Sequence, residues 1–160
     1  MGDMNSTIPK RIIQTGKSVD LPPICKAAVA NVKLLNPDFE YLFFDNGQVG
    51  KFIDNIFAEY RTVFDAFPHP IQRYDFFRYL AVYHFGGFYF DLDLLMSEAL
   101  SDLLENSCVF TFESIGINQY LKRNFGMHWD IGNYAFGAAP DHPFIRVIID
   151  NCIKAQVEPE

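Results

Sequence analysis

Short apolar runs alternate with longer amphipathic stretches along most of this chain. The short runs are rich in Phe, Tyr, Ile and Val and end at glycine, asparagine or aspartate, which is typical of strands. We predict strands at residues 10–15, 39–44, 88–90, 108–112 and 134–138. The longer stretches repeat apolar residues at helical spacing, which predicts helices at residues 22–35, 48–60, 71–85, 98–104 and 142–153.

This alternation of strands and helices predicts an α/β fold with a mostly parallel central sheet and helices on both faces. In such sheets, ligands bind outside the carboxyl ends of the strands. Thr15, Asp45 and Asp91 stand at three of the predicted strand ends. We therefore expect these polar residues to lie near a binding site.

The predicted helix at 71–85 is too apolar for a surface helix, yet it carries Asp75 and Arg78. Residues three apart share one face of a helix, so these two side chains can meet. Charged groups in an apolar setting are usually paired or committed to a ligand. Two interpretations stay open: an intrahelical salt bridge that only stabilises the helix, and a pair that contacts a ligand.

The glycine pair at 86–87 ends that helix, and a short aromatic strand then leads to Asp91 and Asp93. Side chains alternate in an extended segment, so the two carboxylates are expected to point the same way. Two acids on one side repel each other unless a cation lies between them. A hard divalent ion that also carries a phosphate ligand suits this pair. The alternative is a strand that simply leaves the core and turns polar.

Composition narrows the class of protein. With 49% hydrophobic and 16% aromatic residues, the chain is expected to form one globular domain over residues 1–160. A formal charge of −7 argues against nucleic acid as a partner, because a backbone binder needs a basic surface. The same charge means that an anionic substrate would need a local cation, which a bound metal would supply.

Three cysteines without metal-type spacing indicate a reducing compartment, and we expect a cytoplasmic protein. No apolar run reaches the ~18 residues of a transmembrane helix. Any membrane association is therefore expected to be peripheral.

Several blocks of the sequence resemble one known family. Its central signature is similar to residues 74–79, Tyr-Asp-Phe-Phe-Arg-Tyr, followed by residues 86–93, Gly-Gly-Phe-Tyr-Phe-Asp-Leu-Asp. Residues 8–15 resemble its first strand, and Asn133 with residues 139–144 resembles a weaker downstream block. On these residues the chain resembles the DxD-containing, sugar-binding glycosyltransferases of family 32. That family includes bacterial capsular-polysaccharide transferases, fungal mannosyltransferases and, more distantly, the clostridial glucosylating toxins.

The resemblance implies a GT-A fold and a metal-dependent glycosyltransferase. Such an enzyme would move a sugar from a nucleotide-diphosphate sugar to a glycan or lipid-linked glycan, with retention of configuration, in polysaccharide, capsule or glycoconjugate synthesis. The implied catalytic residues are Asp75, Arg78, Asp91 and Asp93. Asp91 and Asp93 would hold Mn²⁺ or Mg²⁺, and Asp91 would also touch the ribose or sugar. Asp75 and Arg78 would contact the donor sugar, and Arg78 could also reach the diphosphate.

Further donor contacts are implied by the same resemblance. Gln14 and Thr15 would lie near the nucleotide base, and the donor pocket would also include Gly87, Tyr89 and Asn133.

The chain departs from the family after its first strand, where members usually carry an aromatic residue and this chain has Gly16. Either a stacking partner for the base is missing, or Tyr41 or Phe44 replaces it. The single tryptophan, Trp129, is interpreted as part of the core, with a sugar-stacking platform on the acceptor side as the alternative.

Family catalytic domains normally continue beyond the point that corresponds to Glu160. We therefore expect the C-terminal part of the family domain to be absent from this chain, and donor binding to survive better than transfer. One alternative function is a partial, non-catalytic domain that binds metal and nucleotide sugar. The other is a phosphohydrolase of the haloacid-dehalogenase type, which also places a DxD after an apolar strand, although that strand normally opens its domain.

Overall fold

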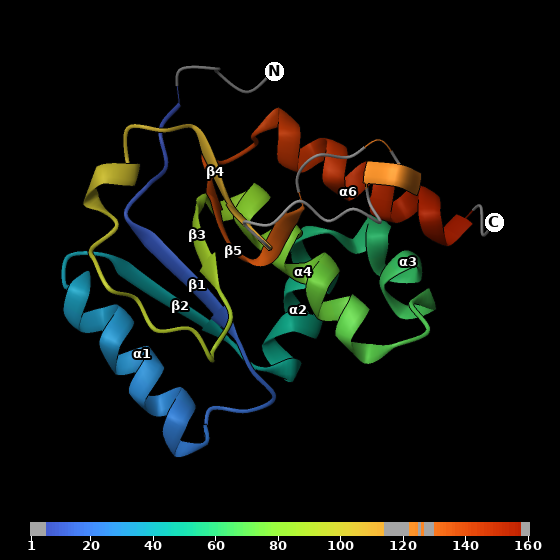
Figure 1. Cartoon of the computed structure of the whole chain (residues 1–160). Coiled ribbons are helices and arrows are strands. Elements are labelled where there is room, and N and C mark those ends of the chain that lie inside the picture. Colours follow the sequence, from blue (N-terminus) through green and yellow to red (C-terminus); the bar gives the residue numbers. More distant parts are fainter. Residues whose placement is uncertain (1–5, 114–121, 125, 127–129, 158–160) are drawn as a thin grey trace.

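The computed structural model contains a five-stranded sheet flanked by helices (Figure 1). It describes residues 6–113, 122–124, 126 and 130–157. The strands are β1 (Arg11–Thr15), β2 (Glu40–Phe44), β3 (Gly87–Phe90), β4 (Cys108–Phe112) and β5 (Ile131–Ala138). All the predicted strands are thus confirmed, with differences only at their ends.

The strand order across the sheet is β2-β1-β3-β5-β4. β1 pairs in parallel with β2 and with β3, whereas β5 is antiparallel to both β3 and β4. β4 therefore runs in the same direction as β1, β2 and β3. The prediction of a mostly parallel sheet is confirmed, and the reversal of β5 makes it a mixed sheet, which strand-helix alternation alone does not predict.

The helices are α1 (Pro23–Leu35), α2 (Asn46–Ile56), α3 (Arg61–Ala66), α4 (Pro70–Phe85) and α6 (Pro143–Val157), and short 3₁₀ segments lie at Ala58–Tyr60 and Ser101–Leu103. α1 packs on one face of the sheet, and α4 and α6 pack on the other (Figure 1). No helix within the described residues is long and apolar enough to cross a bilayer.

Alternation along the strands builds a core on each face of the sheet. Ile12 and Phe88 belong to the core that includes Val32 of α1. Ile13 and Tyr89, one position further along each strand, belong to the larger core that contains α4 and α6. The side chain of Tyr89 therefore lies on the α4 side of the sheet, where Arg78 also lies.

The glycine pair ends α4 and starts β3, as predicted. Gly86 caps the helix with φ of +65°, and its amide donates to the carbonyl of Val82 at 2.8 Å. Gly87 has φ of +110°, and a Cβ there would lie 2.6 Å from the carbonyl oxygen of Arg11. Glycine is needed at this position because the backbones of β1 and β3 approach each other so closely.

Two predicted helices differ from the structure. The segment 48–60 is not one helix, because Phe57 leaves the helical region with φ of −130° and ψ of 45°. α2 also begins earlier, at Asn46, since Asp45 caps it: its carboxylate accepts from the amide of Gln48 at 2.9 Å, and the Gln48 side chain accepts from the amide of Asp45 at 2.9 Å. The predicted helix at 98–104 is reduced to the 3₁₀ segment Ser101–Leu103.

Candidate active site

Two adjoining hollows lie at the carboxyl ends of β1, β2 and β3. The inner hollow has a volume of about 290 Å³ and the outer hollow about 720 Å³. They share Gly16, Lys17, Ile71, Arg78 and Asp91. The inner hollow is also lined by Thr15, Asn46, Pro70, Tyr74 and Tyr89, and the outer hollow by Ser18, Asp20, Leu21, Pro22, Cys25, Leu92 and Asp93. A recess thus lies where the α/β topology predicts a ligand site.

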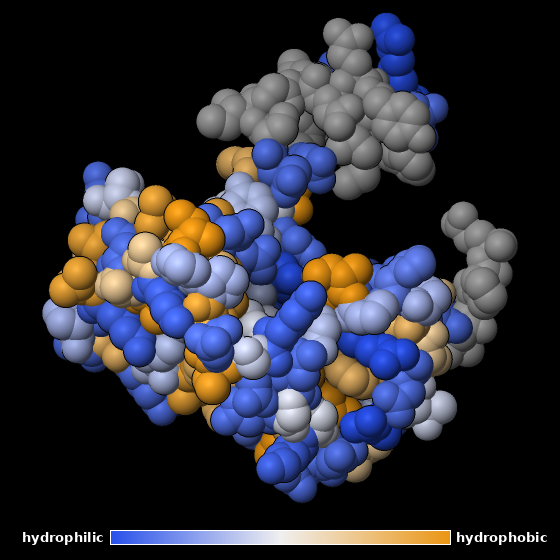
Figure 2. All heavy atoms as spheres, turned by 90° about the horizontal axis from the view of Figure 1, so that it is seen from below, coloured by the Kyte–Doolittle hydropathy of each residue, from blue (hydrophilic) through white to orange (hydrophobic). Residues whose placement is uncertain are grey.

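Figure 2 views the molecule from below Figure 1, toward the end at which these strands terminate. Hydrophilic side chains occupy the middle of this face, and apolar side chains gather at the side that α1 forms.

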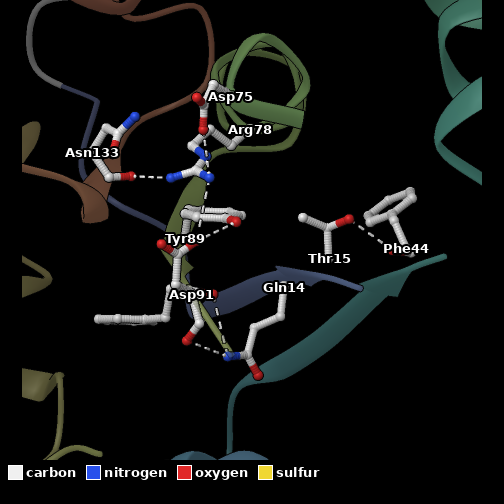
Figure 3. Close-up of polar contacts among 9 residues, drawn as sticks. Gln14, Thr15, Phe44, Asp75, Arg78, Tyr89, Asp91 and Asn133 are labelled. Atoms are coloured by element: carbon white, nitrogen blue, oxygen red, sulfur yellow. Dashed lines mark hydrogen bonds and ion pairs between the residues drawn. The ribbon is translucent and has the colours of Figure 1, made fainter. Parts of the chain in front are cut away.

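Arg78 is the centre of the polar contacts at this end of the sheet (Figure 3). Its side chain is buried, and one terminal nitrogen, Nη2, lies 2.7 Å from an oxygen of Asp75 and 3.4 Å from an oxygen of Asp91. The other, Nη1, donates to the backbone carbonyl of Asn133 at 2.7 Å. The guanidinium carbon lies 4.6 Å from the ring centroid of Tyr89. α4, β3 and β5 are therefore joined through one guanidinium group.

The intrahelical salt bridge between Asp75 and Arg78 is confirmed. Burial raises the pKa of the Asp75 carboxyl, while the Arg78 guanidinium opposes that rise. The second carboxylate near Arg78, that of Asp91, shows that Arg78 also serves a group outside its own helix. The bridge and a role at the hollows therefore coexist, because both hollows are lined by Arg78.

Tyr89 orients the carboxylate of Asp91. Its hydroxyl donates to Oδ1 of Asp91 at 2.8 Å, and burial raises the pKa of this hydroxyl well above its usual range. Tyr89 therefore remains a neutral donor at any physiological pH. Tyr89 lines the inner hollow, and its place in a donor pocket stays a prediction.

The expected extended geometry of the DxD pair is wrong. β3 ends at Phe90, and Asp91 to Asp93 form a turn in which the amide of Leu94 approaches the carbonyl of Asp91 at 3.4 Å. Alternation of side chains therefore does not apply to the pair, because it requires an extended backbone. Asp91 and Asp93 nevertheless line the same outer hollow, and Asp93 is exposed.

These two carboxylates fit a small, hard divalent cation. The described part of the chain contains no group of three or more His, Cys, Asp or Glu side chains that could enclose a metal. Mg²⁺ and ions like it are often held by one or two carboxylates, with waters and substrate phosphates completing the coordination. An exposed Asp93 beside a partly buried Asp91 suits that mode of binding rather than a closed structural site.

Gln14 differs from its expected place beside a ligand. Its side chain is 0% exposed and lines neither hollow. Its amide nitrogen donates to the carbonyls of Phe90 and Asp91 (Figure 3). Its oxygen accepts from the hydroxyl of Tyr41. A fully buried amide with these partners contacts the DxD turn from within the protein. Thr15 lines the inner hollow, although its hydroxyl donates to the carbonyl of Phe44 at 3.0 Å.

Gly87 was expected in the donor pocket, and the structure corrects this. It begins β3, whereas the hollows lie at the opposite end of that strand, beside Asp91. The signature motif spans the whole strand, so membership in the motif does not place every residue at the site. Asn133 does lie at the site, through the backbone carbonyl that accepts from Arg78.

Neither candidate for base stacking lines a hollow. Tyr41 is engaged with Gln14, and Phe44 packs against Phe52, Phe77 and Phe85 in the core. The aromatic residues that line the inner hollow are Tyr74 and Tyr89. From the sequence, Tyr74 was noted only as part of the family signature. Trp129 lies outside the described residues.

Sequence reasoning also missed Lys17, Asn46 and Ile71. All three lie close to the end of a secondary-structure element. Lys17 comes two residues after β1, Asn46 comes two residues after β2, and Ile71 is the second residue of α4. All three line the inner hollow. The rule that ligands bind beyond strand ends could have indicated Lys17 and Asn46.

Comparison with known families decides the class of protein. A family model described as "Glycosyltransferase sugar-binding region containing DXD motif" matches residues 22–110, more than half of the chain. The chain belongs to this glycosyltransferase family. The family expected from the sequence is therefore confirmed.

Two fungal proteins are similar over most of this chain. Inositol phosphoceramide mannosyltransferase 2 of Schizosaccharomyces pombe is 32% identical over 148 residues, which are 92% of this chain and 39% of that protein. Mannosyl phosphorylinositol ceramide synthase SUR1 of Saccharomyces cerevisiae is 29% identical over 137 residues, which are 86% of this chain and 32% of that protein. The chain thus spans well under half of the length of these relatives.

A solved structure confirms the GT-A-like fold. The PaToxG glycosyltransferase matches with a TM-score of 0.68 and 15% identity, over 94% of this chain and 62% of that chain. At this identity, the likeness concerns the fold.

Proposed function

We propose that this chain carries the donor site of a metal-dependent glycosyltransferase, which moves a sugar from a nucleotide-diphosphate sugar to a hydroxyl acceptor. The observation that supports this most strongly is the arrangement of Arg78, Asp75 and Asp91, with Asp93 beside them, at two joined hollows beyond the carboxyl ends of the strands. The family membership supports the same reaction class.

Arg78 and Asp75 would recognise the donor. A guanidinium suits planar, two-point contact with phosphate or sugar oxygens. The Nε of Arg78 is buried and has no hydrogen-bond partner among the described residues. The carboxyl oxygens of Asp75 can accept from sugar hydroxyls, and the salt bridge with Arg78 keeps both groups oriented for the same ligand.

Asp93 and Asp91 would hold Mn²⁺ or Mg²⁺ against the diphosphate. The ion would supply Lewis-acid stabilisation of the charge that grows on the leaving diphosphate. In this proposal Tyr89 keeps the carboxylate of Asp91 in place through its hydrogen bond, and Arg78 offsets the charge of that carboxylate. The donor pocket would also include Thr15, near the base.

The acceptor is proposed to be a glycan or a lipid-linked glycan, with mannose as the first sugar to test and retention as the expected stereochemistry. The similar fungal proteins are named for mannosyl transfer to inositol phosphoceramide, a lipid. Peripheral contact with a membrane and a cytoplasmic location are part of the same proposal.

The test is a screen of GDP- and UDP-sugars with the purified chain in Mn²⁺ or Mg²⁺. A bound donor at 100 times its dissociation constant should add about 2.7 kcal/mol to the free energy of unfolding. Transfer to inositol-containing lipids and to free glycans is then followed by mass spectrometry. Stabilisation without any turnover would favour a non-catalytic binding domain, and release of phosphate from a simple phosphate ester would favour the phosphohydrolase.

A further inference from the structure

Gln14 lies where the backbone ladder between β1 and β3 stops. The two strands pair only at Ile12 with Phe88 and Ile13 with Tyr89. Beyond that register, the side chain of Gln14 replaces the ladder: its Nε2 donates to the carbonyl of Phe90 at 3.2 Å and to that of Asp91 at 3.3 Å. The backbones of β1 and β3 therefore diverge toward the hollows, while the carbonyls of Phe90 and Asp91 still have a hydrogen-bond donor in Gln14.

The orientation of this amide is set by a second residue. Tyr41, on the neighbouring strand β2, donates its hydroxyl to Oε1 of Gln14 at 2.9 Å. A hydroxyl donor on the oxygen keeps both hydrogens of the amide nitrogen directed at β3. Burial raises the pKa of Tyr41 to about 12, so this hydroxyl stays protonated under physiological conditions.

The opposite side of Asp91 is held as well. Its amide donates to the carbonyl of Tyr134 of β5 at 2.8 Å. The backbone of Asp91 is thus fixed on one flank by a main-chain bond and on the other by the side chain of Gln14. The side-chain bond is the one that an amino-acid change can remove.

Resting on the donor site proposed above, we infer that Gln14, oriented by Tyr41, is a positioning residue for the DxD turn. It touches no ligand. It determines where the carboxylates of Asp91 and Asp93 lie, and therefore how well they hold a divalent ion against a diphosphate. Partners that orient metal ligands in this way typically change metal affinity or activity by roughly 10- to 100-fold when removed.

A matched control exists in Asn36. This buried amide, 3% exposed, also bonds to the backbone: it donates to the carbonyl of Val32 at 2.9 Å and accepts from the amide of Leu100 at 2.9 Å. It lines neither hollow. Gln14→Leu and Asn36→Leu should therefore both lower the melting temperature, since each leaves buried backbone groups unpaired.

The experiment compares Gln14→Leu, Tyr41→Phe and Asn36→Leu with the wild type at a temperature where circular dichroism shows all four to be folded. Mn²⁺ affinity with a non-hydrolysable nucleotide-sugar analogue is measured by electron paramagnetic resonance. We expect a loss of roughly tenfold or more for Gln14→Leu, a smaller loss for Tyr41→Phe and no change for Asn36→Leu. Analogue affinity without metal should change little in any variant.

Gln14→Glu gives a signature that a purely structural role would not produce. A protonated carboxyl can donate to one of the two carbonyls, whereas a carboxylate can only accept and would repel both. The ratio of variant to wild-type kcat for donor hydrolysis should therefore rise as the pH falls from about 8 to about 6, since burial favours the neutral acid. KM for the donor should move less than kcat.

Three results would overturn the inference. If the wild type binds the donor with Mn²⁺ and Gln14→Leu binds it equally well, Gln14 only supports the fold. A kcat ratio for Gln14→Glu that does not vary with pH would have the same meaning. If the wild type shows no Mn²⁺-dependent donor binding, the proposed function fails, and the positioning role fails with it.

Discussion

An arginine lies at each end of β3, Arg11 at its start and Arg78 at its exit, and the two side chains contact different groups. At its start, Arg11 donates to the carbonyl of Phe85, the last residue of α4, and to an oxygen of Glu40 at 2.7 Å. At its exit, Arg78 faces two carboxylates, a backbone carbonyl and an aromatic ring, and its Nε has no partner in the part of the chain that the structure describes. Arg11 has the contacts of a structural cap, whereas Arg78 has those of a ligand-binding group.

The two ends also differ in backbone. The start requires glycine, because the chain has positive φ at Gly87 and no room for a Cβ. The exit forms a turn that presents two carboxylates to a hollow. Changes at the start should therefore affect stability, and changes at the exit should affect donor binding and chemistry.

The largest effect is expected from Asp93→Ala. Loss of an exposed carboxylate at the outer hollow should lower Mn²⁺-dependent donor affinity by roughly 100-fold, or about 2.7 kcal/mol, while the fold stays intact. Removing a charge near Asp91 should, if anything, raise the stability of the metal-free protein. Calorimetric donor titration in Mn²⁺ measures the loss, and Asp102→Ala, also exposed but outside both hollows, is the control. Equal losses in the two variants would contradict a specific role for Asp93.

Arg78→Lys tests the arginine comparison directly. Lysine keeps the charge but cannot make a planar two-point contact. We expect donor affinity to fall about 10- to 100-fold, which corresponds to the loss of a charged hydrogen bond of about 1.5–3 kcal/mol. Arg11→Lys is the matched variant at the other end of β3 and should leave donor affinity within about twofold of wild type, because Arg11 lines neither hollow. Its surface ion pair with Glu40 contributes about 1 kcal/mol or less to stability. If Arg78→Lys only lowers the melting temperature, the pair with Asp75 is a structural bridge.

Gly87→Ala tests whether the start of β3 is separate from the site. A residue with a Cβ at φ of +110° would meet the Arg11 carbonyl at 2.6 Å, so the free energy of unfolding should fall by about 1–3 kcal/mol. Donor affinity of the folded fraction should not change. Urea unfolding and titration at low temperature measure the two quantities. Gly50→Ala, in α2 with no atom closer than 4.0 Å, is expected to be neutral or stabilising.

Contacts between residues close in sequence could be predicted, and contacts between residues far apart in sequence could not. Asp75 and Arg78 are three apart on one helix, so their pairing follows from helical spacing. The glycine stop of α4 and the end of β3 just before Asp91 also follow from local pattern. The burial of Gln14 does not, because it depends on Tyr41 from one strand and on the exit of another. The cap of α2 also follows from local pattern, since Asp45 and Gln48 have the spacing of a capping box, although the predicted helix starts two residues too late, at residue 48.

The smallest effect is expected from Tyr41 at high pH. In the folded protein its pKa is about 12, whereas an unfolded tyrosine ionises near pH 10. Between these values the folded state holds more protons, so the free energy of unfolding should fall as the pH rises above about 10. Tyr41→Phe should be less stable at pH 8 but show a shallower fall between pH 9 and 11. Urea unfolding across that range measures the slope, and identical slopes would show that Tyr41 does not contribute.

The most direct test of the account is a calorimetric titration of the wild-type chain with the nucleotide sugar found in the screen, with and without Mn²⁺. The account predicts that the ion tightens donor binding by at least about 100-fold, or about 2.7 kcal/mol, because Asp91 and Asp93 can hold it against the diphosphate. Donor affinity that is the same with and without Mn²⁺ or Mg²⁺ would contradict the assignment of the DxD turn as the metal site.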